Sequence, residues 1–396
     1  MVDKNLKPGR KVWRFDQIAT NVNVRIDNPS ESGMEHYIGL EHLDPNSLRI
    51  RRWGSPGDVK ATKLAFKRGD IIFGRRRAYQ RKLGVAEFDG ICSAHAMVLR
   101  AKPNVVLPEF LPFFMQSDLF MNRAVEISVG SLSPTINWKT LATQEFALPS
   151  IEEQHRLLSL LSSIDECLAS FADADLATKA LENSRIERAL ASVSDDCVIA
   201  VDKLVLKGPR NGLSPKTNAD ERGYPTLSIS AVRDGRIVAE GNTKYAEISE
   251  AEAAAFELKA NDALVVRGNG NKILTGKCGL VDVVPKGCFY PDLLIRLQFD
   301  EKIIRPEFAV LQWNSQSTHS RLVSRAKSTN GIWKINGADI RQHRLKVPKL
   351  EEQDALLAEI RVIRSARTSI NARKEAAENL KTHALMCIDN GCANGV

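Results

Sequence analysis

The chain has few features of a secreted or membrane protein. No stretch approaches the ~18–20 uninterrupted apolar residues needed to cross a bilayer. Residues 1–11 are polar and basic, unlike a secretory signal. The seven cysteines are scattered without a Cys-x-x-Cys pair, which argues for reduced thiols and against a disulfide framework or a structural zinc site. We therefore expect a cytoplasmic protein with no membrane contact.

Common enzyme signatures are also missing. Gly276-Lys277 would need a glycine at 271 to form a phosphate-binding loop, but Asn271 stands there. Gly268-x-Gly270 lacks the third glycine of a dinucleotide site. No Asn/Asp-Pro-Pro-Tyr/Phe stretch of an amino-methyltransferase occurs, and the seven histidines show no ligand spacing. The sequence predicts a non-catalytic chain without a cofactor or metal of its own.

The main positive feature is an internal duplication. Leu148-Pro149-Ser150-Ile151-Glu152-Glu153-Gln154 has a counterpart in Val347-Pro348-Lys349-Leu350-Glu351-Glu352-Gln353, and the Glu-Glu-Gln triplets lie 199 residues apart in a chain of 396. Each motif enters a long proline-free segment. Acidic residues at these helix starts suit the helix dipole. A period of this length indicates one globular domain plus one long helix, present twice, and not a solenoid.

Both long segments carry apolar residues at three- and four-residue steps, typical of a helix that packs on another helix. The seam residues are Leu157, Leu161, Ile164 and Leu168, then Ile360, Ile363, Ile370 and Ala377. Some 40 residues would span roughly 60 Å. We predict an α+β fold in which two similar domains are separated by two long helices packed as an antiparallel coiled coil. The alternative is that each helix only caps its own domain.

The predicted boundaries are a first domain at 1–149, a central helix at 150–192, a second domain at 193–348 and a distal helix at 349–390. Short strands are expected within both domains, because Gly69-Asp70-Ile71-Ile72-Phe73 is echoed by Asn261-Asp262-Ala263-Leu264-Val265. Pro108-Glu109-Phe110 is expected to open a helix that runs through Phe120, and Pro306-Glu307-Phe308 echoes it.

The positive charge is concentrated in one window. The whole chain has a net charge of +8, whereas residues 49–82 hold twelve Lys/Arg and two Asp. The run Gly74–Lys82 follows a predicted strand and includes an aromatic residue. Arginine suits both phosphate and the guanine edge. We expect DNA contact here, the alternative being a solvated basic loop; the candidates are Arg51, Arg52, Arg75, Arg76, Arg77, Tyr79, Arg81 and Lys82.

The equivalent loop of the second half contains asparagines and glycines, which suit base edges and close backbone approach, although a plain hairpin turn is the alternative. A Gly/Ser loop before the last strand of each domain is a third candidate, and residues 207–211 are a weaker one. The further DNA-binding candidates are Ser131, Ser133, Lys139, Lys207, Arg210, Arg267, Asn269, Asn271, Lys272, Lys327, Asn330 and Lys334. Matched loops with different side chains predict two different half-sites.

The paired Pro-x-x-Glu-Glu-Gln helices and the half-length duplication resemble the specificity (S) subunits of type I restriction-modification systems, from about Trp13 to Asp389. The resemblance implies two target recognition domains that read a split, asymmetric sequence in double-stranded DNA. It implies helices that set the spacer and bind two methyltransferase (M) subunits, with restriction (R) subunits joining them. S-adenosylmethionine, ATP and Mg²⁺ would belong to those partners.

Three alternatives remain open at this point. The chain could serve a system that only methylates DNA. It could be a DNA-binding nuclease of an unrecognised kind, which metal-dependent cleavage by the isolated protein would reveal. It could also be a coiled-coil assembly protein without a DNA site, in which case replacing Arg75, Arg76 and Arg77 by alanine would leave function intact.

Overall fold

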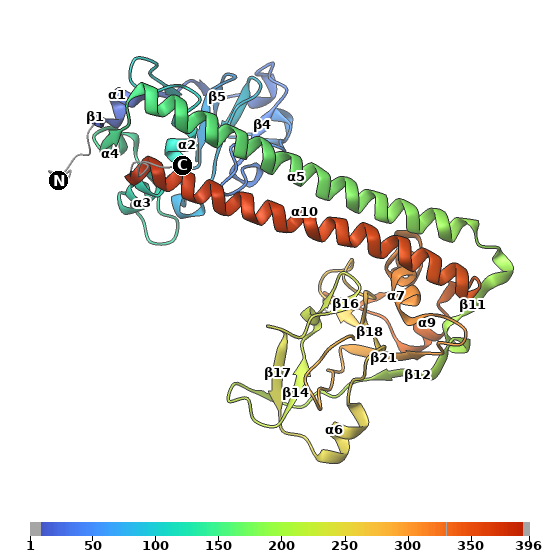
Figure 1. The fold of residues 1–396 in the computed structure, drawn as a ribbon. Coiled ribbons are helices and arrows are strands. Elements are labelled where there is room, and N and C mark those ends of the chain that lie inside the picture. The colour runs from blue at the N-terminus through green and yellow to red at the C-terminus, as the bar shows by residue number, and fades with distance from the viewer. Residues whose placement is uncertain (1–8, 330, 391–396) are drawn as a thin grey trace. The chain divides into compact units, whose positions relative to one another are not determined.

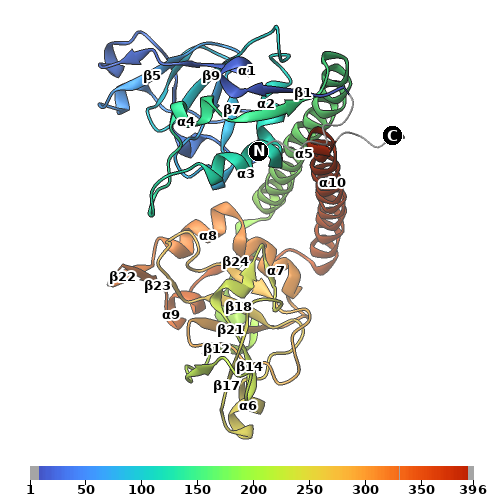
Figure 2. The same cartoon turned by 90° about the vertical axis from the view of Figure 1, so that its left-hand side faces the viewer.

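Two long helices, α5 (Ile151–Ser192) and α10 (Leu350–Asn390), have 42 and 41 residues. The computed structural model describes residues 9–329 and 331–390. The chain divides into unit 1, which is Met1–Ala172 with Asn371–Val396, and unit 2, which is Asp173–Ile370. Each unit therefore contains one α+β domain, part of α5 and part of α10. Both helices lie side by side in the two views (Figures 1 and 2).

The two helices run antiparallel. In unit 2, Asp175 of α5 pairs with Arg367 of α10 at 2.7 Å, and Glu182 pairs with Arg364 at 2.8 Å. The residue number rises along α5 while its partner's number falls along α10, which defines the antiparallel direction. The predicted fold class, two similar α+β domains with two long helices packed as an antiparallel coiled coil, is confirmed.

In unit 1, the start of α5 and the end of α10 complete the core of the first domain. Leu157, Leu161 and Ile164 of α5 are buried in one hydrophobic cluster with Ala384 and Ile388 of α10. The same cluster includes the helices that follow the first domain's central sheet. The end of α10 thus belongs to the core of a domain that precedes it by more than two hundred residues.

Unit 2 uses the opposite ends of the same helices. Ile186 and Leu190 of α5 are buried in a cluster with Leu356, Leu357 and Ile360 of α10. Each domain is therefore packed against the start of the helix that follows it and the end of the other helix. This exchange explains why both helices need an apolar seam along most of their length.

The two domains share a sheet order. In unit 1 the order is β2 (Ala19–Val22), β9 (Met97–Ala101), β6 (Ile71–Phe73) and β7 (Leu83–Val85). In unit 2 it is β12 (Val205–Asn211), β21 (Leu294–Phe299), β18 (Ala263–Val266) and β20 (Cys278–Leu280), extended by β16 (Arg236–Ile237) and β15 (Val232–Arg233). Figure 2 shows β12, β21 and β18 adjoining in unit 2. The predicted sequence echoes therefore mark equivalent strands.

Further small sheets surround these two. Unit 1 has β3 (Arg25–Ile26), β5 (Lys63–Phe66), β8 (Gly90–Ser93) and β4 (Tyr37–Ile38) in that order. Unit 2 has β13 (Thr217–Asn218), β17 (Thr243–Ala246) and β14 (Tyr224–Leu227), followed by α6 (Glu250–Phe256). Each domain is closed by pairing its first and last strands, which are β1 (Lys11–Arg14) with β10 (Glu145–Leu148), and β11 (Val198–Ala200) with β24 (Arg344–Lys346).

A matching turn leads into the central strand of each domain. The Asp70 carboxylate accepts a hydrogen bond from the Lys67 backbone N–H at 2.8 Å, and Asp262 accepts one from the Lys259 N–H at 3.0 Å. The residue before each aspartate has a positive φ, 87° at the glycine and 68° at the asparagine. Glycine and asparagine tolerate this conformation best. The repeated Gly/Asn-Asp pair is therefore a turn signal and not a binding motif.

The prediction of one continuous helix from Pro108 through Phe120 is wrong. The structure has α2 (Leu111–Gln116) and α3 (Asp118–Glu126), which are interrupted at Ser117. The Ser117 backbone is extended, and its hydroxyl accepts a hydrogen bond from the Phe120 N–H, so the serine starts a new helix. The second domain repeats the break between α7 (Pro306–Asn314) and α8 (Gln316–Val323). The short α1 (Phe15–Ile18), α4 (Trp138–Ala142) and α9 (Gly337–Arg341) complete the helices of the two domains.

The glutamine of the first Glu-Glu-Gln triplet is fully buried. The Gln154 side-chain oxygen accepts a hydrogen bond from the Leu107 backbone N–H at 2.9 Å. Its amide group donates to the carbonyl oxygens of Pro149 at 3.0 Å and Val105 at 3.4 Å. This side chain fixes the first turn of α5 to the segment that precedes α2.

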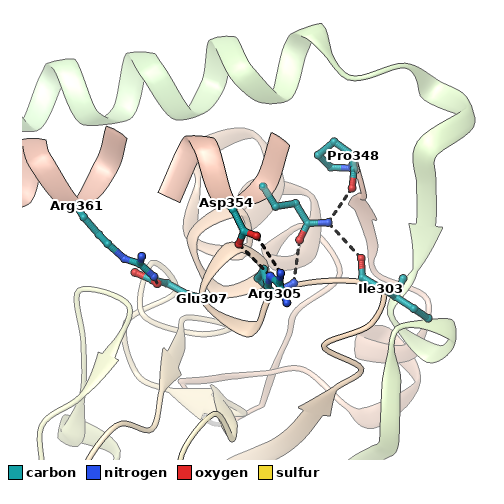
Figure 3. A network of polar contacts seen from close by, with 7 residues as sticks. Ile303, Arg305, Glu307, Pro348, Asp354 and Arg361 are labelled. Atoms are coloured by element: carbon teal, nitrogen blue, oxygen red, sulfur yellow. Dashed lines mark hydrogen bonds and ion pairs between the residues drawn. The ribbon is translucent and has the colours of Figure 1, made fainter. Parts of the chain in front are cut away.

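Gln353 makes the same three hydrogen bonds in unit 2. It accepts from the Arg305 N–H at 2.8 Å and donates to the carbonyl oxygens of Pro348 at 2.8 Å and Ile303 at 3.2 Å. Figure 3 labels Pro348, Ile303 and Arg305, and dashed lines mark the hydrogen bonds that end on them. The repeated motif therefore has a structural role, because both copies of the glutamine attach a long helix to its domain.

The ion pairs beside Gln353 are particular to the second half. Arg305 donates two hydrogen bonds of 2.9 Å to Asp354, and Arg361 pairs with Glu307 (Figure 3). In the first half, Leu107 stands where the second has Arg305, and Ser162 stands where the second has Arg361, so neither ion pair can form there. The glutamine contacts, in contrast, occur at both helix starts.

A buried histidine makes the stability of unit 2 dependent on pH. His343 is 4% exposed and packs edge-to-face against Trp313, with ring centroids 4.8 Å apart. Burial, reinforced by Arg321 and Arg325, lowers the pKa of His343 to about 3. The unfolded chain binds a proton near pH 6.5, so protons favour the unfolded state over the range between these two pKa values.

We expect unit 2 to lose about 1.4 kcal/mol of stability per pH unit through this histidine as pH falls from about 6.5 toward 3. His343→Gln should flatten that part of the curve, as measured by urea unfolding at several pH values. Replacing the exposed His155 by glutamine is the control. An unchanged slope in His343→Gln would show that His343 is not buried in its neutral form.

Candidate nucleic-acid interface

Two candidate loops of the first domain are joined by backbone hydrogen bonds. The segments 74–82 and 128–139, here called the first loop pair, are far apart in sequence. Thr135 forms bridges with both Val129 and Arg76. The Ile136 N–H donates to the Arg75 carbonyl at 3.0 Å. The structure therefore brings together two regions that the sequence identified separately.

The segment 74–82 has an unusual backbone. Arg77 and Arg81 both have left-handed φ values, 58° and 52°, and they flank a single 3₁₀ turn at Ala78–Gln80. Non-glycine residues in this region are uncommon and mark strained or functional loops. Ala78 is buried beneath the turn, whereas Tyr79 is 56% exposed. Tyr79 is therefore exposed on a turn that the buried Ala78 fixes to the domain.

Several cations of this segment are held by the domain itself. Arg81 pairs with Asp118 at 2.7 Å and donates to the Asn46 side chain at 3.1 Å. The Lys82 ammonium donates to the Leu40 carbonyl at 2.8 Å. Both side chains are half-buried. Their contacts indicate that they anchor the loop, whichever ligand it binds.

Three consecutive arginines differ in their environment. Arg75 donates to the Ala94 carbonyl at 3.0 Å, and Arg76 lies 3.3 Å from the His95 ring nitrogen. Burial, followed by the charges of Arg76 and Arg75, lowers the pKa of His95, so the ring is neutral at pH 7 and accepts from Arg76. Arg77 is exposed, with its Nε 3.2 Å from the Ser133 hydroxyl. Arg77 is therefore the arginine best placed for a ligand.

The remaining predicted residues of the first domain lie on its surface. Ser131 and Lys139 are exposed within 128–139. Arg51 and Arg52 are exposed on a separate segment, and Arg52 pairs with Asp44. The half-buried Trp138 packs on the core, edge-to-face with Phe15, and the two ring centroids lie 6.0 Å apart. This tryptophan therefore has a packing role.

The second domain joins its equivalent loops in the same way. The segments 267–277 and 324–336, here called the second loop pair, meet where β19 (Gly268–Asn269) pairs with β23 (Ile332–Lys334). The strand β22 (Lys327–Thr329) pairs with β23 on its other side. The Ile335 N–H donates to the Arg267 carbonyl at 2.9 Å, matching the bond between Ile136 and Arg75.

The side chains of 267–277 are partly used to shape the loop. The Asn269 oxygen accepts from the Asn271 N–H at 2.8 Å, and the Asn271 oxygen accepts from the Ile273 N–H at 2.9 Å. The Lys272 ammonium lies 4.4 Å from the Trp333 ring centroid, within cation–π range. The amide NH₂ groups of the two asparagines take no part in these turn contacts, because the oxygens make them.

Other predicted residues of unit 2 have mixed roles. Arg267 is held by Asp292 at 2.7 Å. Arg210 donates to the Ala255 carbonyl at 2.9 Å and lies over the Phe256 ring. Lys207, Lys327 and Lys334 are exposed, and Asn330 lies outside the described residues.

Charge is the property that the two loop pairs share. Each pair contains six Lys/Arg and no Asp or Glu. Arg81 and Arg267 are neutralised by carboxylates from outside the loops. Six of the remaining cations are exposed and favour a polyanion such as the DNA backbone: Arg77, Lys139, Lys272, Arg325, Lys327 and Lys334.

The predicted seam residues pack within the chain. Leu157, Leu161, Ile164 and Ile360 are buried, and Leu168, Ile363, Ile370 and Ala377 are half-buried. A partner protein on these helices would therefore contact mainly other positions. Exposed apolar side chains on the helices include Leu176, Leu181 and Val362 in unit 2. Within the described parts of the chain, no helix is long and apolar enough to span a membrane. Across those same residues, no group of three or more His, Cys, Asp or Glu is arranged to hold a metal.

Comparison with known proteins finds similar sequences and similar structures. Residues 40–173 match the family described as the type I restriction modification DNA specificity domain. The specificity subunit of the type I restriction enzyme EcoKI from Escherichia coli (strain K12) is 26% identical over 354 residues, covering 85% of this chain and 74% of that protein.

Two solved structures share the fold across nearly the whole length. One is a chain from work on complex assembly and conformational transition of the type I R-M system, with a TM-score of 0.60 and 16% identity, covering 98% of this chain and 99% of that chain. The other is the type I restriction-modification system S subunit from M. genitalium, with a TM-score of 0.55 and 13% identity, covering 97% and 96% of the two chains. The resemblance predicted from the paired helices is therefore confirmed: the chain is similar to the specificity subunits of type I restriction-modification systems.

Proposed function

We propose that this chain is the non-catalytic subunit that reads DNA sequence in a type I restriction-modification complex. The observation that carries the proposal is the pairing of two acid-free, cationic loops at equivalent positions in both domains. The similarity to specificity subunits supports the same function. The domains 1–149 and 193–348 would then be target recognition domains in contact with double-stranded DNA.

The target is bipartite and asymmetric in this proposal, because the two loop pairs expose different side chains. Exposed Arg77 suits the O6 and N7 atoms of guanine, whereas the NH₂ groups of Asn269 and Asn271 are donors for acceptor atoms on base edges. Anchored cations such as Arg81 and Lys82 would keep the loop in place. The helices 150–192 and 349–390 would set the separation of the two half-sites.

Two methyltransferase subunits would bind this chain, and restriction subunits would join that core. The exposed apolar side chains of α5 and α10 supply surfaces for such partners, since large apolar residues at 51–71% exposure gain from burial. S-adenosylmethionine, ATP and Mg²⁺ would be held by the partner subunits, in the cytoplasm. A system that only methylates would use the same reading surface; cleavage of unmodified DNA by the assembled complex distinguishes the two.

The bipartite proposal predicts half-site-selective defects. In complex with its methyltransferase, Arg77→Ala should weaken binding about 10- to 100-fold, and the loss should disappear when the first half-site is scrambled. Asn271→Ala should give the same pattern for the second half-site. DNase footprinting and fluorescence anisotropy on the target found by methylome sequencing provide the measurement.

Arg68→Ala is the matched control, because Arg68 is an exposed arginine of the same domain that precedes β6, whereas the first loop pair follows it. Its affinity should stay within about twofold of wild type. A single contiguous footprint, or none, would contradict the bipartite target. Equal losses at both half-sites in Arg77→Ala would contradict the assignment of that residue to one of them.

A further inference from the structure

Each loop pair carries a large apolar side chain in an exposed position. Leu132 is 91% exposed in the first loop pair, and Ile273 is 70% exposed in the second. Single exposed apolar residues are common on protein surfaces. These two differ from most because each lies in a loop pair that contains six Lys/Arg and no acid. Each is also the most exposed of the large apolar residues in its pair, ahead of Val129 at 71% in the first pair and Leu274 at 47% in the second.

Leu132 is mounted on a narrow hairpin. The backbone of Val129 and Thr135 exchanges two hydrogen bonds, of 3.1 and 2.9 Å, which close the loop around it. Gly130 has a φ of +118°, a conformation that suits glycine and allows the sharp reversal. Thr135 also forms a bridge with Arg76 in the other loop. The hairpin tip is therefore fixed to the basic segment.

Ile273 is mounted on a turn held by Asn271. The Asn271 side chain accepts from the Ile273 N–H at 2.9 Å, and its carbonyl accepts from the Leu274 N–H at 3.1 Å. The Thr275 hydroxyl donates to the Trp333 carbonyl at 3.4 Å, which connects the turn to β23. Hydrogen bonds therefore also fix the turn that carries Ile273. This turn lies in the first segment of its loop pair, 267–277, whereas Leu132 lies in the second segment of its pair, 128–139.

The surrounding charge indicates what would cover these side chains. With six exposed cations and no acid in the two loop pairs, the complementary surface is a polyanion. An apolar tip can be buried against duplex DNA by entering a groove and separating adjacent base pairs, as apolar wedges do in proteins that kink DNA. Cations on both sides would hold the flanking phosphates.

We propose that Leu132 and Ile273 are apolar wedges, each of which inserts between adjacent base pairs in one half-site. The inference rests on the proposed function and extends it, because the chain would then select its target partly by how easily one base step opens. Pyrimidine–purine steps open most easily, so each half-site should favour such a step at the wedge position. Neither wedge requires a hydrogen bond to a base.

The test uses the chain with its methyltransferase partner and duplexes of the mapped target, with 2-aminopurine placed at successive positions. Wild-type protein should raise the 2-aminopurine fluorescence at one step in each half-site, which reports unstacking. Leu132→Ala should abolish the rise in the first half-site alone and weaken binding about tenfold, since it removes most of an apolar side chain that becomes buried. Ile273→Ala should do the same in the second half-site, and Leu132→Met should retain the signal.

Val283→Ala is the matched control, because Val283 is 77% exposed and lies outside both loop pairs. Its fluorescence profile and affinity should match those of wild type. Variants that bind the target with normal affinity and unstacking would overturn the wedge proposal. So would variants that read DNA normally but no longer assemble with the methyltransferase, because the tips would then be protein contacts. Absence of any sequence-specific binding by the wild-type complex would instead overturn the proposed function itself.

Discussion

Ile388→Asp is expected to unfold unit 1. Ile388 is fully buried near the end of α10, in the cluster formed by the first domain and the start of α5. The substitution removes a large apolar side chain and places a carboxylate in an apolar core, so we expect a loss of at least about 4 kcal/mol. That is a large fraction of the ~5–15 kcal/mol that stabilises a typical domain.

The measurement is urea unfolding combined with limited proteolysis, which separates the fragments of the two units. Leu380→Asp is the matched control, because Leu380 lies on the same helix and is 53% exposed. It should change stability by less than about 0.5 kcal/mol. The reciprocal variant Ile186→Asp, on α5, should unfold unit 2 and spare the first domain. First-domain fragments that resist protease normally in Ile388→Asp would show that α10 is not part of that core.

Regular features of the chain were predictable from local sequence. The apolar seam and the absence of proline predicted the two long helices, which are found at 151–192 and 350–390. The repeated Gly/Asn-Asp pair located equivalent strands β6 and β18, because a tight turn and an apolar run are both local signals. The break at Ser117 was missed, although the serine is followed at once by an acidic residue, as many helix starts are.

Long-range pairing was not predictable in this way. No local sequence signal around Ile388 indicates that this residue is part of the core of the first domain, more than two hundred residues earlier in the chain. The bonds that join residues 74–82 to 128–139 likewise depend on the folded sheet. The charge pattern also could not distinguish cations that bind a ligand from cations that hold the loop in place. In the structure, Arg81 and Lys82 are anchored by neighbours and Arg77 is exposed.

The glutamines illustrate the same limit. The two glutamates of each triplet predicted a helix start, because acidic residues favour the N-terminal end of a helix. The buried members of the triplets are instead Gln154 and Gln353. Their hydrogen bonds reach segments about 50 residues earlier in the chain. A buried amide with three backbone partners is restricted to one residue type, which explains why the glutamine occurs at both helix starts.

Gln353→Leu is expected to destabilise unit 2 by about 3 to 5 kcal/mol. The substitution removes the partner of the buried Pro348 carbonyl and of the half-buried Arg305 N–H and Ile303 carbonyl, and a buried group left without a partner costs about 1–3 kcal/mol. Asp354→Asn removes the neighbouring ion pair, whose members are 37% and 51% exposed, and should cost less than about 1 kcal/mol. The neutral amide therefore matters more than the charged pair beside it.

Thermal and urea unfolding measure both effects, with exposed Gln342→Leu as the matched control. Gln154→Leu should destabilise unit 1 similarly, because it removes the same three hydrogen bonds. Gln353→Glu gives a sharper test. Its carboxylate would face two carbonyl oxygens, so the pKa of the introduced acid should be raised and stability should recover as pH falls and protonation restores a donor. A Gln353→Glu variant as stable as wild type at neutral pH would mean that the amide does not donate to these carbonyls, and the role assigned to the repeated motif would fail with it.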